Sequence, residues 1–148
     1  MQGVPAVYFH SLVGSPNDIQ GLEESGQNRR INRHKYNRAE LDDVLAKPDS
    51  LQRRVFDGYS RLLQERAAQP AFHPNASQTV LDLPEDGLLG FVRESGDGER
   101  VAVIANLSDQ PRQVDADAID LRNDVLAIQE IPAGQPIPMR PFQVRWLT

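Results

Sequence analysis

The strongest constraint on the fold is an apolar run close to the start of the chain. The stretch GVPAVYFHSL occupies residues 3–12, and its apolar members, interrupted only by Pro5, are Val4, Ala6, Val7, Tyr8 and Phe9. Such a run is typical of a strand buried on both faces of a parallel sheet. No second run of this kind follows within the next seventy residues. Because an unpaired strand is an exposed edge, we expect it to belong to a sheet whose other strands lie outside this chain.

Composition places the chain among globular proteins. Its 148 residues suffice for one ordinary domain, or for a small domain with an appendage. It contains no cysteine, which excludes a disulfide scaffold and a thiolate metal site. The apolar start is too short to cross a bilayer and lacks the features of a signal peptide. We therefore expect a cytoplasmic protein with no membrane partner.

Charge is unevenly distributed along the chain. Residues 1–75 carry ten basic and nine acidic side chains, which gives +1, whereas residues 76–148 carry six and twelve, which gives −6. The basic residues cluster in NRRINRHKYNR, residues 28–38, and such a cluster can bind nucleic acid. The rest of the chain is acidic and carries no recognised nucleic-acid motif, so we expect no nucleic-acid partner.

The first half of the chain predicts a long loop and two helices. Residues 13–28 are rich in glycine, asparagine and proline and are typical of a loop. One helix should begin after Asn37, with Glu40 completing a capping box, and end before Pro48. A second helix should be capped by Asp49 and continue through Arg66 with apolar residues at helical spacing.

Beyond residue 76 the apolar pattern has a period of two. The expected strands cover residues 79–83, 88–94, 100–107, 112–116, 125–131 and 142–147. Their spacing of about ten residues favours an antiparallel sandwich of the immunoglobulin-like type. Its expected core comprises Val80, Leu83, Leu89, Phe91, Val101, Val103, Ala105, Val125, Ala127 and Trp146. We therefore predict two parts, residues 1–75 and residues 76–148.

Four segments together resemble a known family. GVPAVYFHSLVGSPND and GQNRRINRHKY resemble the eighth strand and following loop of the α-amylase family of glycoside hydrolases (family 13). The pairing of GSPND with INRHKY is similar to sucrose phosphorylases and related glucoside phosphorylases. RLLQERAAQPAFHP resembles the last helix of their barrel and its exit, and ERVAVIANLSDQP resembles strands of their C-terminal β domain. The resemblance implies a mixed fold, with the last strand and helices of a (β/α)₈ barrel in residues 1–75 and an all-β antiparallel sandwich in residues 76–148.

The resemblance also implies an activity. These enzymes break a glucosidic bond with retention, through a nucleophilic carboxylate and a second carboxylic acid, before phosphate or water accepts the glucose. Those acids follow strands four, five and seven of the family's barrel, which this chain does not contain. We therefore assign no catalytic residue, no cofactor and no metal site, and expect the isolated chain to be inactive. The adjacent acids Glu23–Glu24 and Asp42–Asp43 are expected to be solvated.

One part of the substrate site is nevertheless expected here. Arg33 matches the arginine that, in sucrose phosphorylases, helps to hold the hydroxyls of the bound glucose, a task suited to a planar, multi-donor guanidinium. His34, Asn17 and Asp18 are candidates for shaping the same pocket. The partners of the whole enzyme would be a glucoside and phosphate. The isolated chain should self-associate through its unpaired N-terminal segment.

Two other interpretations of the sequence stay open. The chain could come from an α-amylase-family hydrolase, in which water rather than phosphate accepts the glucose. It could also be a separate β-sandwich module that binds carbohydrate, although residues 76–148 contain only three aromatic side chains, Phe91, Phe142 and Trp146. The sequence does not identify the sugar.

Overall fold

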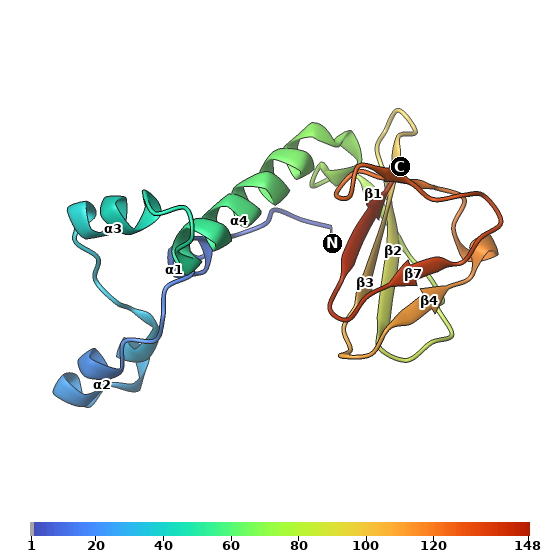
Figure 1. Ribbon diagram of the computed structural model, residues 1–148. Helices are drawn as coiled ribbons and strands as arrows, with labels where there is room; N and C mark the ends of the chain where they lie inside the picture. The colour runs from blue at the N-terminus through green and yellow to red at the C-terminus, as the bar shows by residue number, and fades with distance from the viewer. Residues whose placement is uncertain (1) are drawn as a thin grey trace. The chain divides into compact units, whose positions relative to one another are not determined.

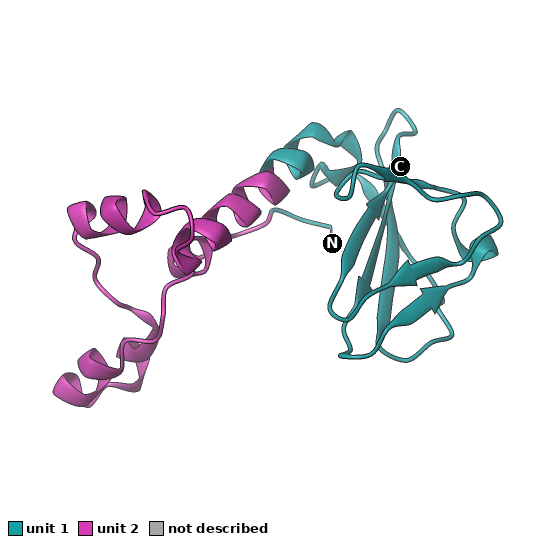
Figure 2. Ribbon diagram, viewed as in Figure 1, with its two compact units in different colours: residues 1–4, 64–148 teal, residues 5–63 magenta. Residues whose placement is uncertain are grey.

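The computed structural model describes residues 2–148, which divide into two compact units. One unit is Pro5–Leu63, and the other comprises Gln64–Thr148 with the residues up to Val4 (Figure 2). No helix within residues 2–148 is long and apolar enough to cross a membrane. Each unit is described separately below.

The unit Pro5–Leu63 consists of short helices and loops (Figure 1). Its elements are α1 (Phe9–Leu12), α2 (Ile19–Ser25), the 3₁₀ helix η1 (Asn28–Asn32), α3 (Arg38–Leu45) and the first part of α4 (Leu51–Ala68). Helix α2 lies inside the segment 13–28, for which we predicted only a loop. Within residues 5–63 only Val13 and Gly21 are buried, so this unit has almost no core of its own.

The strand expected over residues 4–9 is not formed in this chain. Residues 4–8 have no regular structure, and α1 begins at Phe9. Val4 is 80% exposed and Tyr8 is 49% exposed. A strand needs a hydrogen-bonded neighbour, and no described residue pairs with this segment. The sequence pattern of a buried strand is therefore present without the sheet that would bury it.

Local side-chain contacts set the starts of α3 and α4. The side chain of Asn37 accepts a hydrogen bond from the backbone N–H of Ala39 at 2.9 Å, so the predicted N-cap of α3 is confirmed. The prediction that Asp49 caps the next helix is wrong. Ser50 does so, because its Oγ accepts a hydrogen bond from the N–H of Arg53 at 3.1 Å. Helix α4 ends at Ala68, two residues beyond the predicted end.

The second unit is built from two antiparallel sheets (Figure 1). The larger sheet has the strand order β1-β2-β3-β8-β5-β6, and the smaller one pairs β4 with β7. The strands are β1 (Ser77–Val80), β2 (Leu88–Glu94), β3 (Arg100–Asn106), β4 (Arg112–Val114), β5 (Asn123–Asp124), β6 (Gln129–Glu130), β7 (Ile137–Met139) and β8 (Val144–Leu147). Two further 3₁₀ helices are η2 (Pro70–Phe72), which precedes β1, and η3 (Ala116–Ala118), which lies between β4 and β5. The expected antiparallel sandwich is thus present.

Several strand predictions differ from the structure, most clearly at segment 125–131 and at β7. Residues 125–128 of the predicted strand 125–131 form a turn between β5 and β6, because the carboxylate of Asp124 accepts hydrogen bonds from the N–H groups of Leu126 and Ala127 at 3.0 and 3.2 Å. Ile128 then adopts a positive φ of 53°, which a strand does not allow. Strand β7 was not predicted, because its centre is Pro138 and prolines are rare within strands.

The core of the second unit lies on both faces of β3. Ala102 and Ile104 point into one cluster with side chains of the smaller sheet, including Val114, Ile137 and Met139. Val101 and Val103 point the other way, into a cluster with Phe72 and Phe91, against which Trp146 packs. Of the expected core residues, Phe91, Val101, Val103 and Ala105 are buried, and Leu83 and Trp146 are partly buried. Val80, Leu89 and Ala127 are exposed, and Val125 is half-buried.

A buried arginine fastens the segment before β1 to the larger sheet. Arg93 on β2 is fully buried, and its guanidinium donates hydrogen bonds to the carbonyls of His73, Ala76 and Ser77 at 2.7, 3.0 and 3.0 Å. Within residues 2–148 no carboxylate pairs with it, and its Nη1 has no hydrogen-bond partner. Burial lowers the pKa of Arg93, and the nearby charge of Arg66 lowers it further.

Candidate functional site

A cluster of aromatic rings marks the region where the substrate residues were expected. His10 lies with its ring edge against Tyr8 and Phe9, at centroid distances of 5.2 and 5.3 Å. Tyr36 contacts the ring of His34 edge-on at 4.6 Å, and its ring centroid lies 6.1 Å from that of His10. These contacts bring the segment around residues 8–10 together with residues 34–36 in one unit.

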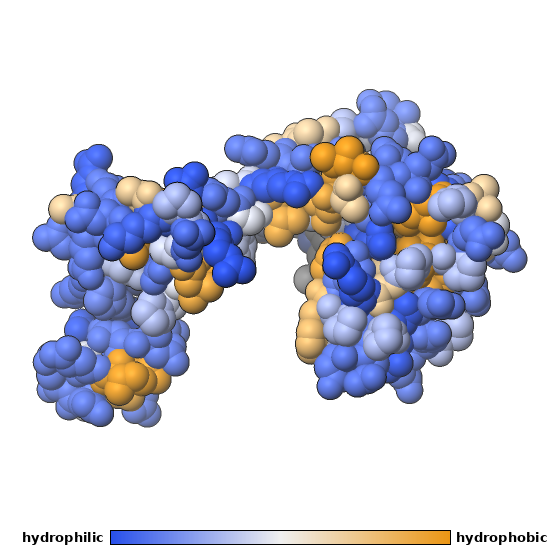
Figure 3. All heavy atoms as spheres, in the orientation of Figure 1, coloured by the Kyte–Doolittle hydropathy of each residue, from blue (hydrophilic) through white to orange (hydrophobic). Residues whose placement is uncertain are grey.

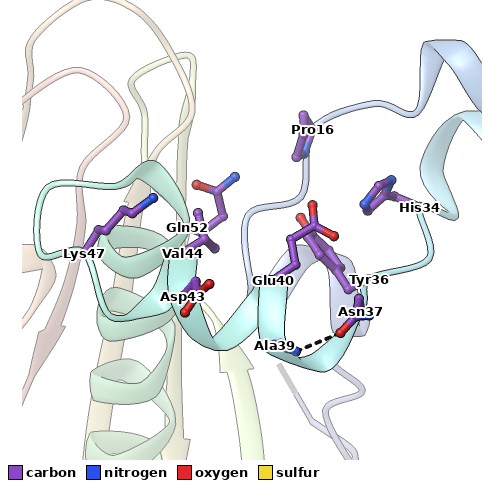
Figure 4. Close-up of a pocket in the computed structure, with 10 residues that line it drawn as sticks. All are labelled: Pro16, His34, Tyr36, Asn37, Ala39, Glu40, Asp43, Val44, Lys47 and Gln52. Carbon is purple, nitrogen blue, oxygen red and sulfur yellow. Dashed lines mark hydrogen bonds between the residues drawn. The ribbon is translucent and has the colours of Figure 1, made fainter.

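Two hollows border this cluster. The larger, of about 700 Å³, is lined by Pro16, His34, Tyr36, residues of α3, Lys47 and Gln52 (Figure 4). The smaller, of about 260 Å³, is lined among others by Tyr8, His10, Asn17 and Asn32. His34 and Asn17 therefore line different hollows, and only Pro16 is shared between the two.

Asp18 organises the chain around the smaller hollow. Its Oδ1 accepts a hydrogen bond from the N–H of Gly21 at 2.9 Å and so caps α2. Its Oδ2 lies 3.8 Å from the guanidinium of Arg30. Its backbone N–H donates to the carbonyl of Ile31 at 2.7 Å. Both carboxylate oxygens are thus engaged by the protein, and Asp18 joins the start of α2 to η1.

Arg33 combines a fixed backbone with a free side chain. Its N–H donates to the carbonyl of Arg30 at 3.0 Å, which closes the 3₁₀ helix η1. Its side chain is exposed, and within residues 2–148 its guanidinium makes no hydrogen bond and no ion pair. The donors of this guanidinium are available to a ligand.

The carboxylates near the hollows do not form a catalytic pair. Glu40 and Asp43 line the larger hollow from α3 and are both exposed (Figure 4). The adjacent acids Glu23–Glu24 and Asp42–Asp43 are also exposed, as predicted. Retaining hydrolysis relies on one carboxyl whose environment keeps it protonated beside another that stays ionised. The exposed carboxylates here lack two such contrasting environments. They can contact a polar ligand through hydrogen bonds.

Sequence reasoning missed the aromatic members of the site. The strand predicted over residues 4–9 includes Tyr8, and neither His10 nor Tyr36 was given a role in the site. One available signal was the recurrence of rings in VYFH and RHKY on either side of the predicted loop. The spacing alone gives no reason for the two stretches to meet, because the contact depends on how α2 and η1 fold the loop back.

Known proteins match the chain over both predicted parts. A family profile described as the D-apionate lactonase C-terminal immunoglobulin-like domain matches residues 85–147. Glucosylglycerate phosphorylase of Allomeiothermus silvanus is 48% identical over 114 residues, which cover 77% of this chain and 20% of that enzyme. Glucosylglycerate phosphorylase of Escherichia coli is 32% identical over 145 residues, which cover 98% of this chain and 25% of that enzyme.

The chain is similar over most of its length to glucoside phosphorylases of the α-amylase family. Sucrose phosphorylase of Agrobacterium vitis also matches, at 39% identity over 71 residues, or 48% of this chain and 13% of that enzyme. The chain spans about a fifth to a quarter of the length of the two glucosylglycerate phosphorylases. It corresponds to a sucrose phosphorylase-like C-terminal part.

Solved structures of two sugar-converting synthases are similar to this chain in fold. Trehalulose synthase MutB from Pseudomonas mesoacidophila aligns with 81% of this chain and 23% of its own, at a TM-score of 0.54 and 21% identity. Isomaltulose synthase from Klebsiella sp. LX3 aligns over the same shares, at a TM-score of 0.54 and 20% identity. At this identity the likeness concerns the fold alone. The expected C-terminal β domain is confirmed, whereas the barrel strand expected over residues 4–9 is not formed in this chain.

Proposed function

We propose that the chain is the C-terminal part of an enzyme that transfers glucose from glucosylglycerate to phosphate with retention. The observation that carries this proposal is the 32% identity to the Escherichia coli glucosylglycerate phosphorylase, which extends over 98% of the chain. The two reacting carboxyls would come from the part of the enzyme that this chain does not include. The isolated chain would therefore be inactive.

Arg33 is the residue of this segment that we propose to contact the sugar. Its exposed guanidinium has no partner within residues 2–148 and can donate several hydrogen bonds to neighbouring glucose hydroxyls. His34 and Asn17 would line the pocket, as each already lines a hollow. Asp18 would shape it indirectly, because its carboxylate is occupied by Gly21 and Arg30.

A chimeric enzyme tests this proposal. The 145-residue matching part of the Escherichia coli enzyme is replaced by this chain, and phosphate-dependent release of glucose 1-phosphate is measured with glucosylglycerate and with sucrose. We expect activity with glucosylglycerate, a large loss in the Arg33→Ala chimera, and none in the isolated chain. A folded chimera active only with sucrose would overturn the proposed substrate, and full activity of the Arg33→Ala chimera would overturn the role of Arg33.

The proposal also covers organisation and association. We place the end of the barrel-derived part at residue 75 and the start of the β domain at residue 76. In the isolated chain, Val4, Val7, Tyr8 and Phe9 are all exposed, at 80, 39, 49 and 48%. These side chains favour self-association of the isolated chain through its N-terminal segment.

A further inference from the structure

Three consecutive carbonyls before Arg33 each accept a hydrogen bond. The carbonyl of Arg30 accepts from the N–H of Arg33 at 3.0 Å, and that of Ile31 accepts from the N–H of Asp18 at 2.7 Å. The carbonyl of Asn32 accepts from the phenolic hydroxyl of Tyr8 at 3.0 Å. Of the three donors, the Tyr8 hydroxyl is the one that a side-chain substitution can remove cleanly.

The bond from Tyr8 acts on the peptide group next to Arg33. That group contains the carbonyl of Asn32 and the N–H of Arg33, and the peptide bond keeps them in one plane. Tyr8 holds the carbonyl end while Arg30 holds the N–H end. With both ends held, the plane cannot rotate without breaking a hydrogen bond, and the direction of the N–Cα bond of Arg33 is set.

The ring of Tyr8 is itself held in place. It packs edge-on against His10 at a centroid distance of 5.2 Å, and His10 Nδ1 lies 2.9 Å from the hydroxyl of Ser15. Tyr8 also lines the smaller hollow together with Asn17 and Asn32. The hydroxyl therefore reaches the carbonyl of Asn32 from a ring that also packs against His10.

We infer that Tyr8 is a positioning residue for the sugar contact made by Arg33. This inference rests on the proposed function, in which the guanidinium of Arg33 binds hydroxyls of the glucosyl group. Tyr8 does not touch the sugar in this role. It orients the 32–33 peptide group before the sugar binds. The entropy cost of ordering this backbone is therefore not subtracted from the binding free energy.

The test compares Tyr8→Phe with Arg33→Ala in the chimera described above. Removing one hydrogen bond of this kind weakens an interaction by about threefold to tenfold, so we expect Tyr8→Phe to lower kcat/KM for glucosylglycerate by that factor. The same substitution in the Arg33→Ala chimera should cost nothing more, because the group that Tyr8 positions is gone. Tyr59→Phe on α4 is the matched control, since its hydroxyl makes no hydrogen bond within the described residues, and it should leave kcat/KM unchanged.

The outcomes separate this inference from the function on which it rests. If Arg33→Ala retains full kcat/KM, the proposed sugar contact fails. If Arg33→Ala loses activity but Tyr8→Phe does not, or if Tyr8→Phe costs as much without Arg33 as with it, the positioning role is overturned. A second measurement needs only the isolated chain: Tyr8→Phe should shift the amide resonance of Arg33 and leave that of Gly58 in place. An unchanged Arg33 resonance would also overturn the role.

Discussion

At the scale of single residues, two helical glycines have opposite surroundings. A Cβ added to Gly21 in α2 would come within 2.3 Å of Oδ2 of Asp18, whereas one added to Gly58 in α4 would meet nothing within 4 Å. Alanine normally stabilises a helix relative to glycine by about 0.5–1 kcal/mol. At position 21 that gain is opposed by loss of the Asp18 cap, which is worth about 0.5–2 kcal/mol.

We therefore expect Gly21→Ala and Gly58→Ala to change helicity in opposite directions. Gly58→Ala should increase the helical Cα chemical shifts of α4, and Gly21→Ala should decrease those of residues 19–25. Nuclear magnetic resonance of the isolated chain measures both. Equal increases in the two variants would show that the contact between Asp18 and Gly21 does not stabilise α2.

Residue patterns predicted some caps and not others, for physical reasons. Asn37 could be identified because a strong capping residue stands alone before an apolar helical pattern. Asp49 and Ser50 are both good caps and adjacent, and propensity does not choose between them; the structure assigns Ser50 through its bond to Arg53. The role of Asp18 could not be predicted, because its partner Arg30 is reached only after α2 and η1 have folded the chain back.

At the scale of elements, Arg93 is central to how the segment before β1 is held. Replacing it with methionine keeps an apolar stem but leaves the carbonyls of His73, Ala76 and Ser77 without their donors. Each lost bond to a charged donor is worth about 1.5–3 kcal/mol, and removing the unpaired buried charge returns part of that sum. We expect Arg93→Met to destabilise the second unit by roughly 3 kcal/mol.

Urea unfolding followed by tryptophan fluorescence measures this effect. The chain has one tryptophan, Trp146, whose ring centroid lies 4.8 Å from that of Phe72. Phe72 immediately precedes His73, whose carbonyl accepts a hydrogen bond from Arg93. Arg100→Met is the matched control, because Arg100 forms an exposed ion pair with Asp120 at 2.8 Å, and such pairs contribute at most about 1 kcal/mol. Equal stability of Arg93→Met and the unsubstituted chain would mean that the cost of burying the guanidinium equals its hydrogen-bond gain.

The two units should also differ in protection from hydrogen exchange. The second unit has buried clusters on both faces of β3, whereas residues 5–63 bury only Val13 and Gly21. Amides in β2 and β3 should therefore exchange slowly, at a rate set by unfolding of the whole unit, and those in α1 to α3 should exchange fast. Mass spectrometry of the isolated chain checks this. Slow exchange throughout residues 5–45 would show that this unit is stable without a further packing partner.

Prediction of elements succeeded where the apolar alternation was long. Strands β2 and β3 are seven residues each, and their pattern left one interpretation. The segment 125–131 resembled a strand because Val125, Ala127 and Ile131 alternate with other residues. The carboxylate of Asp124, however, accepts hydrogen bonds from two N–H groups and stabilises a turn at residues 125–128. The apolar pattern alone could not establish the predicted first strand, because a strand forms only when its backbone hydrogen-bonds to a neighbouring strand.

At the scale of the whole molecule, the chain corresponds to only part of the relatives that it matches. The chain spans about a fifth to a quarter of the length of the glucosylglycerate phosphorylases that it matches. Some large apolar side chains nevertheless remain on the surface of each unit (Figure 3), among them Phe9 at 48% and Phe142 at 69% exposure. Burial of apolar area is favourable by about 25 cal/mol per Å². Exposed apolar segments therefore provide a driving force for association with a complementary surface.

In the isolated chain, that driving force should produce self-association. We expect light scattering to show a mass that rises with concentration, and the Val7→Lys, Phe9→Lys double variant to remove this rise, because lysine resists edge pairing. Ile128→Lys is the matched control: Ile128 is 85% exposed but lies in the β domain, far along the chain from residues 3–9, so it should leave association unchanged. A concentration-independent monomer mass would contradict the prediction. Equal loss of association in both variants would place the contact outside the N-terminal segment.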